Sequence, residues 1–104
     1  MAVSLAAGTM RRMNPSYAVS WNGIDGMRCA GRLDLGDRAV NLIGTARGTR
    51  CDQTIAFDEI GSVTVERGRL HVDRHAGAAL WIASLDGPGA LREIADRLAA
   101  GAAA

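Results

Sequence analysis

The side chains best suited to bind a charged ligand in this sequence are arginines. All 12 residues counted as lysine or arginine are arginine. A guanidinium donates paired hydrogen bonds that match a phosphate or a carboxylate, which a lysine ammonium does not. Because alanine and glycine are abundant too, a GC-rich coding sequence is an alternative reason for the arginine content. The candidate ligand-binding residues stand at the ends of apolar segments, in or beside turns: Arg28, Arg47, Arg50, Arg74 and His75.

Metal binding has one candidate group. His71, Asp73 and His75 alternate along one segment, so their side chains share a face if that segment is a strand. Histidine and aspartate are ordinary metal ligands, but no cysteine or further histidine stands nearby to complete a ligand set. We therefore expect a polar outer face here, with no metal and no cofactor.

Covalent catalysis finds no matching pattern. No serine lies in a G-x-S-x-G elbow, and no glycine-rich loop carries a lysine for phosphate. Cys29 and Cys51 form no C-x-x-C motif, so we expect two reduced, buried, structural thiols. The sequence predicts a protein that is not an enzyme.

Composition narrows the class of protein further. The chain has 104 residues, 48% of them hydrophobic and 22% charged, with a net charge of +1. These values are typical of one globular domain, and they argue against a dedicated nucleic-acid-binding protein, which carries a strong basic excess. Residues 1–14 lack the pattern of an export signal. We expect them to be a mobile leader on a cytoplasmic protein.

Short apolar segments that alternate with polar residues predict about seven antiparallel strands. The alternation places Val63 and Val65 on an inward face, and apolar neighbours place Trp21 and Trp81 in the core. The alternative for the two tryptophans is an aromatic binding patch. The expected strands are residues 17–21, 27–35, 38–44, 50–57, 60–66, 69–74 and 79–85.

One amphipathic helix is predicted after the last strand. Asp86-Gly87-Pro88 is a helix start, because proline suits the first helical turn. An apolar stripe at helical spacing follows, and Gly101 is the expected stop. The stripe consists of Leu91, Ile94, Ala95 and Leu98. Residues 15–101 are thus expected to form a single domain, with residues 102–104 as a tail.

The order of these elements carries a resemblance. The segment Thr54–Val63 ends an apolar strand and continues with Glu59-Ile60-Gly61-Ser62-Val63, an E-I-x-x-V stretch. It is similar to the junction of the fourth and fifth strands in the pleckstrin-homology-like (PH-like) superfamily, which includes bacterial PH-like and GRAM-type domains. Gly68–Val72, Leu80–Ile82 and the final helix continue the same order. The resemblance implies a mainly β, PH-like barrel of about seven antiparallel strands, capped by one C-terminal α-helix.

In such a barrel, the loops after the first, third and sixth strands share the end opposite the helix, where PH-like domains often bind ligands. That topology would gather the five candidate residues at one end. The alternative is that these arginines pair with neighbouring aspartates and only solvate the loops. We therefore expect an interaction module that binds a protein partner or itself. The second hypothesis is binding of an anionic lipid, or of a small anionic ligand, by the arginine-bearing loops.

Overall fold

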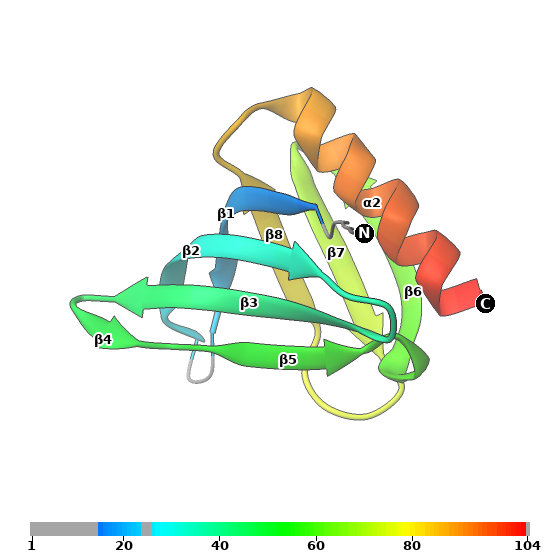
Figure 1. Ribbon diagram of the computed structural model, residues 1–104, viewed down its shortest axis with the longest axis horizontal. Coiled ribbons are helices and arrows are strands. Elements are labelled where there is room, and N and C mark those ends of the chain that lie inside the picture. Colours follow the sequence, from blue (N-terminus) through cyan, green and yellow to red (C-terminus); the bar gives the residue numbers. More distant parts are fainter. Residues whose placement is uncertain (1–14, 24–25, 104) are drawn as a thin grey trace, which may run out of the picture.

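A strongly bent antiparallel sheet followed by a C-terminal helix makes up the computed structural model, which describes residues 15–23 and 26–103 (Figure 1). The expected leader, residues 1–14, lies outside the described residues. The elements are β1 (Ser16–Asn22), β2 (Arg28–Leu35), β3 (Ala39–Ala46), β4 (Thr49–Arg50), β5 (Gln53–Ala56), the 3-10 turn η3 (Phe57–Glu59), β6 (Ile60–Glu66), β7 (Arg69–Arg74), β8 (Leu80–Ser84) and α2 (Pro88–Ala103).

The strands follow the order β4-β3-β2-β1-β8-β7-β6, and β5 also pairs with β3. The sheet bends at β1, whose seven residues all pair with β2 while only Val19–Trp21 pair with β8. In the described residues no ladder joins β5 to β6, so the barrel-like sheet stays open there. The predicted class, mainly β with one C-terminal helix, is confirmed. No helix in the described ranges is long and apolar enough to cross a membrane.

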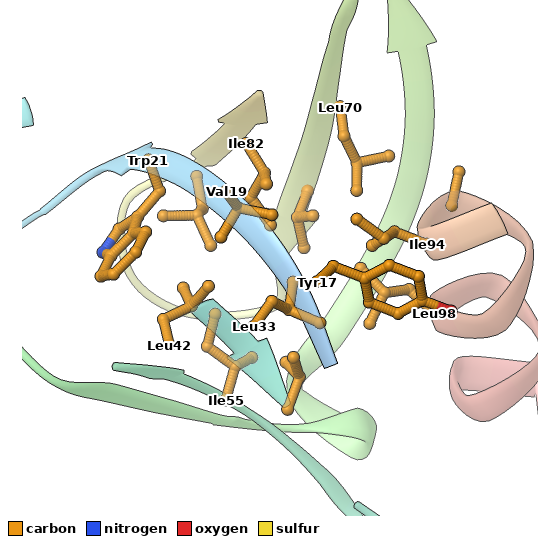
Figure 2. Close-up of a cluster of buried hydrophobic side chains, with 14 of the residues drawn as sticks. Tyr17, Val19, Trp21, Leu33, Leu42, Ile55, Leu70, Ile82, Ile94 and Leu98 are labelled. Carbon is orange, nitrogen blue, oxygen red and sulfur yellow. The ribbon is translucent and has the colours of Figure 1, made fainter. Parts of the chain in front are cut away.

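The inward faces of both halves of the sheet supply the core (Figure 2). Val19, Trp21, Leu33 and Leu42 are each fully buried, as the period-2 alternation along their strands requires. Trp21 is confirmed as a core residue. Burial of such large side chains contributes roughly 1.5–3 kcal/mol each to folding.

Two glycines let β2 and β3 approach closely, and one of them also makes room for the Trp21 indole. Gly31 and Gly44 face each other across β2 and β3. A Cβ at Gly44 would lie 2.9 Å from Cη2 of Trp21, and one at Gly31 would meet the carbonyl oxygen of Ile43. Only glycine fits where the strands and the indole approach so closely.

The helix covers the side that the sheet leaves open. The predicted stripe is confirmed, because Leu91, Ile94, Ala95 and Leu98 are all buried. Figure 2 shows Ile94 and Leu98 beside Tyr17. The helix begins at Pro88 as expected, but the predicted stop at Gly101 is wrong, because α2 continues to Ala103. Gly101 instead packs on the Phe57 ring, where a Cβ would lie 2.9–3.0 Å from three ring atoms.

Three further expectations need correction. The predicted strand 50–57 is divided, because Cys51 and Asp52 leave the strand conformation and Phe57 enters η3. Val65 is 46% exposed, since it lies near the free end of the edge strand β6. Trp81 is half-buried on the outer face, because its neighbours Leu80 and Ile82 take the two inward positions.

Two glycines of α2 provide a matched test of helix docking. Gly89→Ala should raise the free energy of unfolding by about 0.5 kcal/mol, because glycine weakens a helix and the added methyl meets open space. Gly101→Ala should lower the free energy of unfolding by about 1 kcal/mol, since the methyl overpacks against Phe57. Urea unfolding of both variants measures the difference. Equal stabilisation by the two substitutions would show that the last turn does not pack on Phe57.

Candidate functional site

Three connections come together in two adjoining pockets of about 410 and 340 Å³, which share Gly23 and Gln53. They are the β1–β2 connection, the break between β4 and β5, and the β7–β8 connection. Of the five predicted site residues, only Arg50 and Arg74 line these pockets. We call these two pockets together the barrel mouth. The barrel mouth contains two of the five residues that the sequence predicted for a ligand site.

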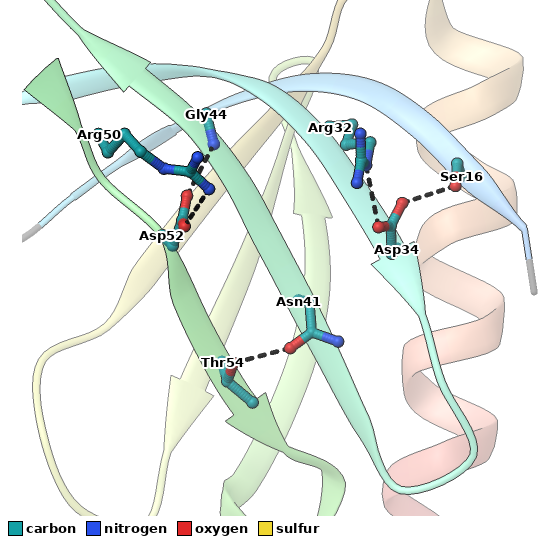
Figure 3. A network of polar contacts seen from close by, with 8 residues as sticks. All are labelled: Ser16, Arg32, Asp34, Asn41, Gly44, Arg50, Asp52 and Thr54. Atoms are coloured by element: carbon teal, nitrogen blue, oxygen red, sulfur yellow. Dashed lines mark hydrogen bonds and ion pairs between the residues drawn. The ribbon is translucent and has the colours of Figure 1, made fainter.

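Arg50 is paired with a carboxylate at this mouth. Its guanidinium donates a hydrogen bond of 2.6 Å to Asp52, which also accepts one of 3.3 Å from the Gly44 amide (Figure 3). The Arg50 hydrogen bond holds the pKa of Asp52 below its usual range. The Cys51 amide donates to the Gly44 carbonyl at 3.0 Å. These bonds fasten the interrupted edge to β3, which is a structural role.

Arg74 also has an internal partner. Its Nε donates a hydrogen bond of 3.1 Å to the Ala78 carbonyl, and its guanidinium lies against Gly77. Gly77 has a φ of 99°, a conformation that favours glycine. The side chain thus holds the β7–β8 connection.

The remaining three predicted residues lie elsewhere. Arg47 occupies the β3–β4 turn with a φ of 52°. His75 follows β7, where its amide donates to the Glu59 carbonyl at 2.9 Å. Arg28 begins β2 on the outer face and lies over Trp81. The five residues do not form one cluster, because strand alternation and turn geometry direct them to different surfaces.

Two of the three side chains considered as metal ligands lie beside other polar groups. His71 lies 3.9 Å from Glu66, and Asp73 accepts a hydrogen bond from Ser62 at 3.0 Å. Within residues 15–23 and 26–103, no three histidine, cysteine or acidic side chains are grouped to hold an ion.

The outer face of the sheet carries an arrangement that the sequence did not reveal. Two guanidiniums flank the Trp81 ring, with Cζ of Arg69 4.6 Å and Cζ of Arg28 5.8 Å from the ring centroid. Both distances are within the range of a cation–π interaction. We call the surface formed by Arg28, Arg69, His71 and Trp81 the Trp81 face.

Strand register brings together the three strands that carry the Trp81 face, β2, β7 and β8, with β1 between β2 and β8. His71 on β7 pairs directly with Trp81 on β8. The Trp81 amide donates a hydrogen bond of 2.7 Å to the Asn22 side chain on β1, and Asn22 pairs with Arg28 on β2. A shallow pocket of about 640 Å³ adjoins this row and is lined by Glu66, Arg67, Arg69 and His71. The Trp81 backbone is therefore held by a hydrogen bond, and arginine side chains lie next to the indole and line the adjoining pocket.

The two thiols are neighbours, which their separation in the sequence conceals. Cys29 is buried, Cys51 is half-buried, and both line the 340 Å³ pocket. Burial and a hydrogen bond with Cys29 raise the pKa of Cys51 to about 11. Both cysteines are free, as expected, but Cys51 is only half-buried because it stands in the break between β4 and β5. That the two thiols approach each other is new.

Comparison with known proteins identifies the fold alone. No family model matches the chain, and no curated protein matches it. The chain is similar to the crystal structure of the C-terminal domain of an unknown protein from Leishmania infantum. The TM-score is 0.59 at 14% identity, over 81% of each chain.

The raised pKa of Cys51 predicts slow thiol labelling. At pH 7 only about one thiol in 10,000 should be ionised, so the rate of reaction with a disulfide reagent should rise about tenfold per pH unit up to pH 10. Cys29→Ala should accelerate labelling at pH 8, because it removes a group that raises this pKa. A rate that levels off near pH 8.5, as for an ordinary thiol, would contradict the assignment.

Proposed function

We propose that this chain is a non-enzymatic, PH-like binding module, and that its Trp81 face docks an acidic segment of a protein partner. The observation that carries the proposal is a half-buried indole held between two guanidiniums on the outer face of the sheet. Tryptophan and arginine are the residues most enriched among the side chains that dominate protein–protein binding energy.

The positive charge around Trp81 favours a partner with acidic side chains. Among the residues that the structure describes, neither Arg28 nor Arg69 forms an ion pair with a carboxylate. Arg67 adds a third positive charge at the adjoining pocket, against the single carboxylate of Glu66. A partner's aspartates or glutamates would therefore meet available guanidiniums, which bind carboxylates through paired hydrogen bonds.

The same charge disfavours self-association through this face. Two copies placed face to face would bring Arg28, Arg67 and Arg69 against the same positive groups, and like charges across an interface are repulsive. An acidic partner relieves this repulsion, so we favour a heterologous contact.

The barrel mouth is a weaker candidate for binding an anion. Arg50 is engaged by Asp52, and Arg74 by the Ala78 carbonyl. A phosphate at the mouth would have to displace these partners. Binding of an anionic lipid at the barrel mouth is therefore the alternative to protein binding, and vesicle sedimentation distinguishes the two.

Titration calorimetry with a short glutamate-rich peptide tests the proposal, with a lysine-rich peptide of equal length as the control ligand. We expect binding of the acidic peptide only, weakened by high salt because screening reduces exposed charge interactions. Trp81→Ala and Arg69→Ala should each reduce affinity at least about tenfold, or 1.4 kcal/mol. Arg92→Ala, which removes an exposed arginine from α2, is the matched control and should leave affinity unchanged.

Sedimentation with phosphatidylserine vesicles distinguishes the two hypotheses. Vesicle binding that is lost in an Arg50→Ala, Arg74→Ala double variant but kept in Trp81→Ala would overturn the proposal and favour lipid binding at the mouth. Equal binding of the acidic and basic peptides would overturn it too.

A further inference from the structure

We propose that the pocket lined by Met27, Cys29 and Cys51 binds a soft monovalent metal ion, copper(I). This inference concerns the barrel mouth and is independent of the Trp81 face. Three sulfur-bearing residues line this one hollow of about 340 Å³. They come from the end of the β1–β2 connection, from β2, and from the break between β4 and β5.

The three sulfur residues differ in depth. Cys29 is 1% exposed, Cys51 is half-buried, and Met27 is 42% exposed although it is a large apolar residue. An ion entering the pocket would therefore pass the flexible Met27 side chain at the rim before it reached the two thiols. Methionine is unbranched and adaptable, so its thioether can follow an ion inward.

Gly23 keeps the space beside the deepest sulfur free. Its amide donates a hydrogen bond of 2.7 Å to the Met27 carbonyl, which ties Gly23 to Met27. A Cβ on Gly23 would lie only 2.6 Å from Sγ of Cys29. Any larger residue would press on this thiol from the pocket side.

The donors favour a soft ion over a hard one. Thiolate and thioether sulfur select copper(I), whereas magnesium and calcium require oxygen ligands. Among the described residues, the one carboxylate that lines the pocket is Asp52, which already accepts hydrogen bonds from Arg50 and Gly44. Zinc in structural sites takes four ligands, and the described residues supply two thiols without a histidine beside them.

Binding involves no change of oxidation state. As each thiol sulfur bonds to the ion, its proton passes to solvent, as metal binding by cysteine requires. The Met27 thioether donates a lone pair and loses no proton. Copper remains monovalent, so neither an oxidant nor a reductant takes part.

Competition for copper(I) under nitrogen tests the site, with copper supplied as its acetonitrile complex and bicinchoninate as the coloured competitor. The full chain should remove one copper per molecule from the chelator. Cys29→Ser and Cys51→Ser should each weaken copper affinity by more than roughly 100-fold. Substitutions of residues that only support a metal ligand typically weaken affinity by roughly 10–100-fold, and loss of a ligand should weaken it further. Met27→Leu should weaken it about tenfold, and because Met27 is exposed this variant should fold normally. Leu85→Ala, which shortens another exposed apolar side chain outside this pocket, is the control and should bind as the unchanged chain does.

Gly23→Ala keeps every sulfur but fills the space at Cys29, so it separates a built pocket from thiols that bind copper in any setting. We expect it to lose affinity at least tenfold while circular dichroism shows native structure. Three results would overturn the proposal: copper remaining with the chelator, unchanged affinity in Met27→Leu, or unchanged affinity in a folded Gly23→Ala variant. None of these measurements involves Trp81. A negative result for copper would therefore not affect the proposal that the Trp81 face binds an acidic peptide.

Discussion

The need to close the core between β5 and β6 is the constraint on which the rest of the structure depends. The sheet bends at β1 and brings its two halves over one another, but its ends do not pair. The apolar stripe of α2 supplies the missing side of the core through Leu91, Ile94 and Leu98. Without that cover, the inward faces of both halves would meet water, at a cost of roughly 25 cal/mol for each Å² of apolar surface. The geometry of both candidate sites therefore rests on the helix.

The pairing of β1 with β8 decides what each tryptophan does. Trp21 faces Ile82 across this ladder and points into the core, so the residue before Ile82 on β8, Trp81, must point outward. A slip of one residue in this ladder would place both indoles on the same face, because strand side chains alternate between faces. The guanidiniums of Arg28 and Arg69 can flank an indole only in the observed register. The surface that we propose for binding is thus a direct product of core packing.

The order of strands and helix, the alternation of inward and outward side chains, and the apolar stripe of α2 could be predicted from the sequence. Each of them depends on residues that are close together in the chain. It misplaced Trp81, since an apolar run such as Leu80-Trp81-Ile82 has no polar residue to show which position faces out. It also expected one arginine cluster, although Arg28 turns to the outer face and Arg50 pairs with Asp52. The approach of Cys51 to Cys29 follows from the packing of separate strands, and no local pattern encodes it.

The interruption at Cys51 and Asp52 has a consequence for how copies of this chain behave in a crowded solution. A long free edge strand offers a row of unpaired backbone groups to which a second molecule can add, and this is a common route to aggregation. Here one edge is divided into β4, with two residues, and β5, with four. At the other edge, the pairing of β6 shifts register between Ile60 and Ser62, and α2 packs against that strand. Neither edge is an even template for an added strand, and at the first edge the break that interrupts it also lines the barrel mouth.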